Sequence, residues 1–399
     1  MPDKTPNHQL SPMSCPRTLE DVDLFSEGAQ EHWYEAYEIL HREAPVLKIP
    51  GEGLGPGSDG YVLTRYADVS RVVKDPVRYP PTLSLLIEQM LAADRPAGEM
   101  PNANAMMLSM MTLRPTVALW RSHRQALTDP WVGPGADRHQ AMIEGHVDDL
   151  ISDWIDRGSV EFISEFARPL PQRVMASVLG FPAEDIPRLE AWGNAQVRAF
   201  VYGRGHRNQL SAQALAEQAE ALAGFRDYVQ EQVAEKRDAP KDDMISFLTQ
   251  VEYQALGRKL TDLEINGVVY AMVIGGLETT QYALEEGAQL LCERDGVFEA
   301  IAEDRSRVRQ FIEECLRLRS PTQGLSTRTT SRDEVFQGIT VPAGSLLHLR
   351  WGAANVDAEE FECPFELDLD RKAASRHLAF SAGPRVCPGA GISRLEQTI

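Results

Sequence analysis

Long apolar runs are absent from this sequence of 399 residues, and no stretch reaches the roughly 18 uninterrupted apolar residues that a membrane helix needs. Residues 1–20 are rich in proline and lack an apolar core, so we interpret them as a disordered arm and not as a signal peptide or membrane anchor. Basic residues are also scarce, because 40 Lys and Arg stand against 59 Asp and Glu, for a formal charge of −19. This balance argues against nucleic acid as a partner, since phosphate binding requires clustered Lys and Arg.

Cysteines are few, and no linker divides the chain. Five scattered cysteines, an odd number, argue against a disulfide framework and favour a reducing, cytoplasmic location. Neither a Ser/Gly-rich tract nor an internal repeat follows the N-terminal arm. With 43% hydrophobic residues the chain can bury a large core, and we predict a single domain over residues 21–399.

One cysteine stands in a loop that could hold a thiolate in a fixed position. Gly383-Pro384 and Pro388-Gly389 bracket Cys387 with turn chemistry, so backbone N–H groups can turn toward the sulfur. Residues 390–399 have helical spacing, which places the cysteine just before a helix N-terminus, where the dipole favours thiolate. Such a thiolate can ligate iron. An inert buried cysteine is the alternative, whereas zinc is disfavoured because Cys363 is too isolated to complete a ligand pair.

The longest helical pattern has an unusual centre. It covers Asp262 to Cys292, and Thr261 with Glu264 predicts a capping box at its start. The glycine pair 275–276 interrupts its apolar run, and each glycine in a helix interior costs about 1 kcal/mol relative to alanine. A cost of that size suggests that a flat or diatomic group approaches the backbone there. A glycine-mediated helix crossing with a polar cap is the alternative.

Helical periodicity dominates the remaining chain and predicts a mainly α fold with a small β region. Strand-like pieces occur near both ends, and Pro342-Ala343-Gly344 predicts a hairpin between the last two. The helices are predicted at residues 31–45, 68–75 and 308–318, with successive amphipathic helices over 139–256, and the strands at 46–49, 61–64, 325–330 and 346–351.

Three patterns resemble motifs of the cytochrome P450 family, and along the chain they occur in the family's order. The cysteine loop reads F-x-x-G-x-R-x-C-x-G from Phe380 to Gly389, which resembles the family's cysteine-ligand loop. Residues 275–279 resemble its oxygen-binding motif, A/G-G-x-D/E-T. Glu314 and Arg317 match its buried E-x-x-R pair, about seventy residues before Cys387. The resemblance implies a triangular, helix-rich domain that encloses haem.

The resemblance also implies roles for individual residues. Cys387 would be the metal ligand, in a loop where Phe380 and Gly389 also contact the haem. Gly275 and Gly276 would leave space for O2.

Four further residues complete these motifs. Glu278 and Thr279 would deliver protons to oxygen, whereas Glu314 and Arg317 would be structural. The residues that would bind the two haem propionates are Trp120, Arg124, Arg328, His377 and Arg385.

By this resemblance the chain is a haem-thiolate monooxygenase with haem b, which inserts one oxygen atom of O2 into a substrate using electrons derived from NAD(P)H. A ferredoxin and a ferredoxin reductase are implied, because the chain has no flavin or dinucleotide domain and no iron–sulfur cysteine set. A haem-thiolate peroxygenase and a non-enzymatic haem-binding protein remain alternatives.

The substrate is less well indicated. The methionine-rich cluster at residues 106–111 either packs in the core or lines a pocket for a hydrophobic small molecule. Arg198, Arg204, His206 and Arg207 form either a solvated basic face or an attractor for an anionic substrate. Family members usually continue past the helix that follows the cysteine, so we interpret the end at Ile399 as a truncation or as a pocket that is closed differently.

Overall fold

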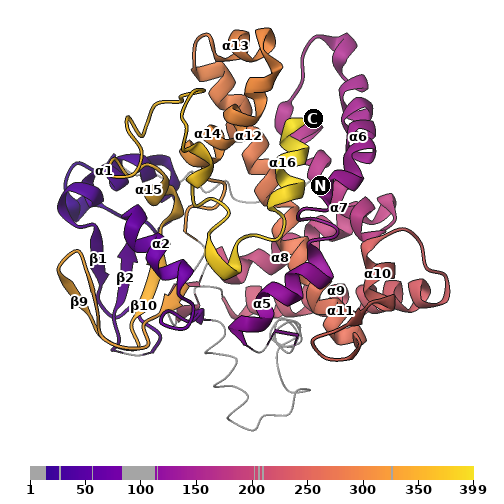
Figure 1. The fold of residues 1–399 in the computed structure, drawn as a ribbon, viewed down its shortest axis with the longest axis horizontal. Coiled ribbons are helices and arrows are strands. Elements are labelled where there is room, and N and C mark those ends of the chain that lie inside the picture. The colour runs from indigo at the N-terminus through magenta and orange to yellow at the C-terminus, as the bar shows by residue number, and fades with distance from the viewer. Residues whose placement is uncertain are drawn as a thin grey trace, which may run out of the picture.

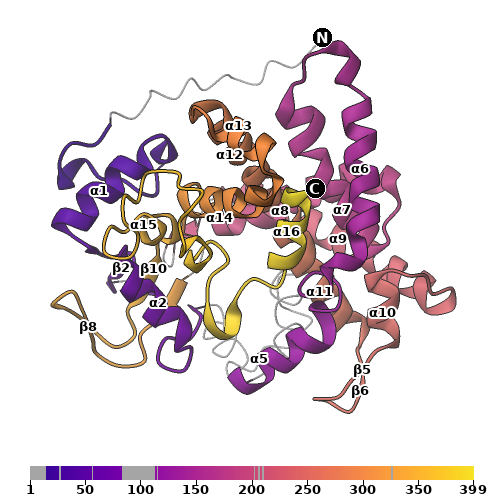
Figure 2. The ribbon, with the colours of Figure 1, turned by 45° about the horizontal axis from the view of Figure 1, so that its top comes forward.

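The computed structural model describes residues 15–399 apart from residues 27, 56, 83–112, 115, 202, 205–206, 209–210 and 325–326. The predictions for residues 106–111 and for the side chains of residues 198–207 lie outside this description. The described chain is mostly helical with small sheets, which confirms the predicted fold class. Figures 1 and 2 show the strands of residues 46–63 and 334–349 on one side of the molecule, the helices of residues 140–179 and 212–276 on the other, and the C-terminal helix of residues 390–398 between them. The short strands of residues 252–259 lie on the side of the helices.

The first elements follow the predicted order of helix, strand, strand and helix. They are α1 (Trp33–Glu43), β1 (Val46–Ile49), β2 (Gly60–Leu63) and α2 (Tyr66–Lys74). The N-terminal arm differs from its prediction at its end, because Leu19–Asp21 forms a short 3-10 turn (η1). The Asp21 carboxylate accepts hydrogen bonds from the backbone N–H groups of Arg17 and Thr18 and thereby stabilises this turn.

One sheet joins the two ends of the chain. β1 and β2 pair in antiparallel fashion, β10 (Leu346–Leu349) is parallel to β2, and β7 (Thr327–Thr329) is antiparallel to β10. The predicted pairing of the last two strands is therefore correct. The prediction missed a separate hairpin between them, β8 (Glu334–Phe336) and β9 (Ile339–Val341), whose turn residues Gln337 and Gly338 both have positive φ.

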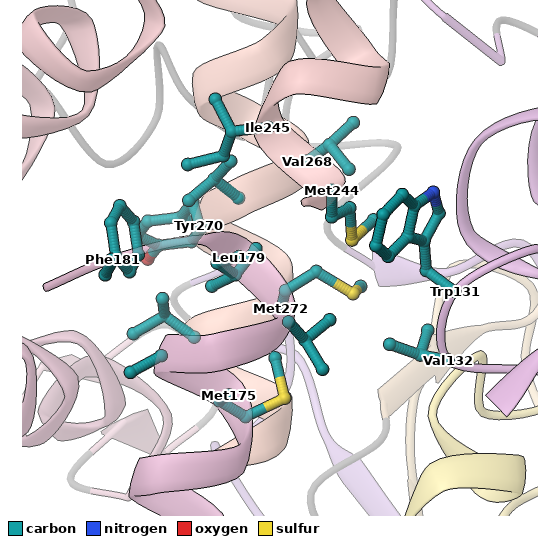
Figure 3. Packing of buried hydrophobic residues seen from close by; sticks show 14 of the residues in the cluster. Trp131, Val132, Met175, Leu179, Phe181, Met244, Ile245, Val268, Tyr270 and Met272 are labelled. Atoms are coloured by element: carbon teal, nitrogen blue, oxygen red, sulfur yellow. The ribbon is translucent and has the colours of Figure 1, made fainter. Parts of the chain in front are cut away.

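The opposite side is a layer of helices around the largest apolar core. Figure 3 shows part of this core, in which Met175 and Leu179 from α7 lie near Met272 from α11. Burial of these side chains explains why the amphipathic pattern folds as helices. The elements are α5 (Val117–His123), η4 (Arg124–Thr128), η5 (Ala136–His139), α6 (Gln140–Ser152), η6 (Ile155–Arg157), η7 (Ile163–Ala167), α7 (Pro169–Leu179), η8 (Ala183–Asp185), α8 (Ile186–Val201), β3 (Gly203–Arg204), β4 (Arg207–Asn208), α9 (Ala212–Asp238), α10 (Met244–Gln250), β5 (Glu252–Tyr253) and β6 (Arg258–Lys259).

The predicted long helix is broken near its middle. It forms α11 (Asp262–Gly276) and α12 (Glu278–Glu293), and the break falls at Leu277. The predicted capping box is present, because Thr261 Oγ1 accepts from the Glu264 N–H and the Glu264 carboxylate accepts from the Thr261 N–H.

The C-terminal elements bring the cysteine loop between the sheet and the helices. They are α13 (Val297–Glu303), η9 (Arg305–Arg307), α14 (Val308–Leu318), α15 (Trp351–Asn355), η10 (Ala374–Arg376), η11 (Gly383–Arg385) and α16 (Ala390–Thr398), whereas η2 (Ala29–His32) directly precedes α1. α16 packs against α12, α14 and η5. No helix in the described part of the chain is long and apolar enough to span a membrane.

Candidate active site

The cysteine loop is fixed by its own backbone and by α2. The Cys387 N–H donates a hydrogen bond of 2.8 Å to the Phe380 carbonyl, which closes the loop. Gly383 has φ +71°, and a Cβ atom there would lie 2.9 Å from the Val73 carbonyl oxygen of α2. Glycine is therefore required at this position both by the backbone conformation and by the close approach of α2.

The Cys387 sulfur is half-buried just before α16. Burial raises the pKa of the Cys387 thiol, and hydrogen bonds from the backbone N–H groups of Gly389 and Ala390 and the charges of Arg124 and Arg394 lower it. These donors can stabilise a metal-bound thiolate. Cys387 does not belong to the one group of three metal-binding side chains found among the described residues, Cys15, His32 and Glu35. A lone sulfur without a second cysteine or histidine ligand beside it in the described part of the chain suits a haem iron better than zinc.

Buried positive charge collects beside this loop. Arg328 is 6% exposed, and its pKa falls to about 9 because of burial and of the neighbouring charge of Arg385. Burial also lowers the pKa of Arg385. Among the described residues no carboxylate forms an ion pair with either guanidinium, whereas Arg124 is 3.2 Å from Asp129. Buried cations without counter-charges are unfavourable, so the site fits an anionic group such as the propionates of haem b.

Sequence reasoning missed Arg114 and His123 in this cluster. The pKa of Arg114 falls to about 9 because of burial and of the charges of Arg385 and Arg124. Burial and the charges of Arg114 and Arg124 lower the pKa of His123 to about 3, so its imidazole is neutral. Neither ring nitrogen of His123 has a hydrogen-bond partner among the described residues. The only available signal was the position of His123 directly before Arg124.

Trp120 has a different role from the predicted hydrogen bond to a propionate. Its indole N–H donates to the Arg114 carbonyl oxygen at 3.1 Å, so that donor is already used. The guanidinium carbon of Arg385 lies 4.9 Å from the centre of the indole ring. Trp120 therefore orients two of the arginines, through a backbone hydrogen bond and a cation–π contact.

The prediction that His377 contacts a propionate is also at odds with the geometry. His377 Nε2 lies 3.2 Å from a Glu313 carboxylate oxygen, and Nδ1 accepts from the Ala379 N–H at 3.1 Å. Both ring nitrogens are thus engaged within the protein. Sequence patterns could not predict this contact, because Glu313 is 64 residues away along the chain.

The two glycines of the long helix differ in their surroundings. A Cβ atom on Gly276 would lie 2.7 Å from the Met175 side chain, so Gly276 permits the close packing of α7. The helix-crossing alternative therefore describes Gly276. A Cβ atom on Gly275 would meet nothing within 4 Å, and the Gly275 carbonyl accepts a hydrogen bond of 2.7 Å from the Thr279 hydroxyl. This side-chain bond competes with the helix ladder and contributes to the break at Leu277.

A second carboxylate, which sequence reasoning missed, lies near Glu278. Burial and the negative charge of Glu190 on α8 raise the pKa of Glu278. α8 approaches the helix break closely, since a Cβ atom on Gly193 would lie 3.1 Å from Leu277 Cδ1. Glu190 is one helical turn before Gly193 and therefore shares its face. The Glu278 carboxyl therefore retains its proton to a higher pH than that of an ordinary glutamate.

Glu314 and Arg317 form a fully buried ion pair with N–O distances of 2.7 and 3.0 Å. The third partner is Arg371, whose Nε donates to Glu314 at 3.0 Å. Arg317 also donates to the carbonyls of Asn355, Pro364 and Glu366. This network ties α14 to the segment that leads to the cysteine loop.

Comparisons with known proteins agree with this arrangement. The family model described as "Cytochrome P450" matches residues 206–399. The polyketide biosynthesis cytochrome P450 PksS of Bacillus subtilis (strain 168) is 27% identical over 376 residues, covering 94% of this chain and 88% of that protein. Vitamin D(3) 25-hydroxylase of Pseudonocardia autotrophica is 29% identical over 377 residues, covering 94% and 86%.

Solved structures give the same result. The crystal structure of P450BioI in complex with hexadec-9Z-enoic acid ligated acyl carrier protein superposes with a TM-score of 0.77 at 26% identity, covering 92% of this chain and 89% of that one. Members of the family use haem b, O2 and electrons derived from NAD(P)H. The chain therefore belongs to the cytochrome P450 family and is a haem-thiolate monooxygenase of small molecules.

Proposed function

We propose that Cys387 ligates the iron of haem b and that this monooxygenase oxidises a hydrophobic small molecule with electrons from a ferredoxin and its reductase. The observation that carries the proposal is the lone Cys387 sulfur at the start of α16, which receives two backbone N–H donors beside buried, unpaired arginines. When bound, thiolate-ligated haem supplies O2 activation and oxygen transfer. The protein has to orient the cofactor, exclude water and move protons.

The buried arginines hold the cofactor by its propionates. Arg328 and Arg385 supply guanidinium groups that lack carboxylate partners among the described residues, and Arg124 shares its charge with Asp129. Arg114 adds a fourth, partly buried cation beside them. Charge-assisted hydrogen bonds to propionates would relieve the mutual repulsion of these groups. Trp120 and His377 assist indirectly, by orienting neighbouring groups.

Protons reach the oxygen side through the broken helix. The Thr279 hydroxyl can exchange its bond to the Gly275 carbonyl for one to a substrate or a water molecule. Glu278 has a raised pKa, so a larger fraction of its carboxyl is protonated near neutral pH. A protonated carboxyl can donate a proton and then regain one from solvent, which suits a relay.

The names of the relatives support an apolar substrate. A structural neighbour at 26% identity was solved with testosterone, another relative is a vitamin D(3) 25-hydroxylase, and P450BioI was solved with a fatty acyl chain on a carrier protein. We infer electron delivery by a separate ferredoxin from the family, whose members imply redox partners. We also propose a cytoplasmic location, since the chain's cysteines are all free.

The absorption spectrum of the reduced, CO-bound protein tests the proposal. We expect a strongly red-shifted Soret band in the wild type and its loss in Cys387→Ser, because only a thiolate ligand shifts the band in this way. Cys292→Ser is the matched control, since Cys292 is an exposed free cysteine on α12. A wild type without the band, or a Cys387→Ser variant that retains it, would show that Cys387 is not the ligand.

A further inference from the structure

A second ion cluster, with a buried carboxylate and a partly exposed arginine, lies one residue away from the E-x-x-R pair. Glu313 on α14 is 4% exposed and binds Arg394 of α16 through both oxygens, at 2.6 and 3.0 Å. His377, which is 5% exposed, lies with its Nε2 atom 3.2 Å from an oxygen of the same carboxylate. Because successive residues of a helix are rotated by about 100°, Glu313 and Glu314 face different partners. Glu313, Arg394 and His377 are called the Glu313 cluster below.

The hydrogen bonds define the ionisation of the cluster. His377 Nδ1 accepts from the Ala379 N–H, so the ring proton resides on Nε2 and is donated to Glu313. Burial lowers the pKa of His377, which keeps the imidazole neutral. Burial alone would raise the pKa of Glu313, but hydrogen bonds from His377 and Arg394 bring it to about 2. The cluster thus holds one negative and one positive charge.

The Glu313 cluster packs against Phe380, whose carbonyl forms a hydrogen bond with the Cys387 backbone. The Arg394 guanidinium carbon lies 4.5 Å from the centre of the Phe380 ring, and the His377 ring centre lies 5.9 Å from it. The carbonyl of Phe380 accepts the hydrogen bond from the Cys387 N–H at 2.8 Å. The charge of Arg394 also lowers the pKa of the Cys387 thiol. The cluster therefore contacts the loop at Phe380, where it begins, and includes Arg394 of α16, the helix that follows it.

From this geometry we infer that the Glu313 cluster is a positioning device that sets the charge felt by the Cys387 sulfur, and thereby the reduction potential of the bound haem. The inference rests on the proposed ligation of iron by Cys387. Positive charge near a thiolate ligand withdraws electron density and favours the reduced iron, whereas negative charge favours the oxidised iron. In the wild type, Glu313 balances most of the charge of Arg394.

Charge-removing variants on the two sides of the pair should therefore have opposite effects. Glu313→Gln leaves Arg394 unbalanced and should raise the reduction potential. Arg394→Gln leaves Glu313 unbalanced and should lower it. We expect each change to be about tenfold in the ferrous-to-ferric ratio at a fixed ambient potential, or about 59 mV. The double variant should return close to the wild-type value, and Arg394→Lys, which keeps the charge, should stay near it.

The test is a spectroelectrochemical titration of the haem-loaded full chain, with the CO spectrum recorded for every variant. Glu165→Gln is the control, because it removes a carboxylate of η7 from a partly exposed ion pair with Arg157 of η6. Opposite shifts that cancel in the double variant support the inference, since loss of a merely structural contact would move both single variants in the same direction. If one variant fails to bind haem, the remaining variants must still show the expected sign.

Two outcomes would overturn the inference, and they differ in what else they affect. If the wild type shows the red-shifted CO band but all variants have equal reduction potentials, or potentials shifted in the same direction, only the role of the Glu313 cluster is refuted. A wild type without that band would refute the proposed ligation by Cys387, and the inference with it.

Discussion

Replacement of Arg328 by methionine should stabilise the haem-free protein while weakening haem binding. Burial and the neighbouring charge of Arg385 lower the pKa of Arg328 from the ordinary value of an arginine to about 9. At about 1.4 kcal/mol per pH unit, this difference corresponds to about 5 kcal/mol of destabilisation of the folded, charged form. Because the pKa is lower in the folded than in the unfolded state, the penalty is fully present below about pH 9 and disappears as the pH rises toward the ordinary pKa of an arginine.

The measured gain should be smaller than this upper bound, since water and side-chain adjustments relieve part of the cost in the haem-free state. We expect Arg328→Met to add about 1–3 kcal/mol to the free energy of unfolding, or about 1–4 °C in the melting temperature for a chain of this size. Haem affinity should fall by about 10–100-fold, because hydrogen bonds to charged groups contribute about 1.5–3 kcal/mol each. Calorimetry of the haem-free protein and haem titration measure the two quantities.

Arg317→Met is the matched comparison, because Arg317 is equally buried but paired with Glu314. Removal of one partner of a buried pair should cost about 3–5 kcal/mol. The two arginine variants should thus shift the melting temperature in opposite directions. If Arg328→Met also lowered the melting temperature of the haem-free protein, Arg328 would have a counter-charge there, and the assignment of the arginine cluster to an absent anion would be wrong.

Three further changes test other parts of the chain. Thr279→Ala should uncouple NADH consumption from product formation, and unchanged coupling would remove the proposed role of the hydroxyl. Glu190→Gln should lower the pKa of Glu278, because a negative charge that raises it is lost. In a pH–rate profile, the decline of turnover at high pH should then begin at a lower pH than in the wild type. A decline that begins at the same pH in both proteins would argue against Glu278 as the proton donor. Thr261→Ala removes the cap of α11 and should reduce the free energy of unfolding by about 1 kcal/mol in a denaturant titration.

Local sequence rules predicted most elements of this fold. Residues 308–318 were predicted as a helix from their periodicity, and α14 has these bounds because one face of it is buried. The helix predicted over residues 31–45 contains α1, and the capping box of α11 follows from two residues three apart. The β8–β9 hairpin was missed because its strands are short and its turn, Gln337-Gly338, lacks a strong turn signature.

Side-chain partners were harder to predict than elements. Trp120 and His377 are both hydrogen-bond donors, and their positions along the chain agreed with propionate contacts. Their donors instead meet a carbonyl of Arg114 and a carboxylate of Glu313, which other segments bring to them. Spacing in the sequence specifies which face of an element a residue occupies, but not which remote segment packs against that face. Glu190 was missed for the same reason, since α8 meets the break at Leu277 only through tertiary packing.

The two sides of the site share one physical feature, which links stability to function. On one side Arg114 and Arg328 are held charged where burial disfavours charge, and on the other Glu278 is held near a second carboxylate. Each arrangement opposes folding of the haem-free chain, so neither would persist if stability alone mattered. An anionic cofactor relieves the first arrangement, which couples folding to haem binding. Nothing needs to relieve the second, because a raised pKa increases the protonated fraction of the Glu278 carboxyl, which is the form that a proton donor requires.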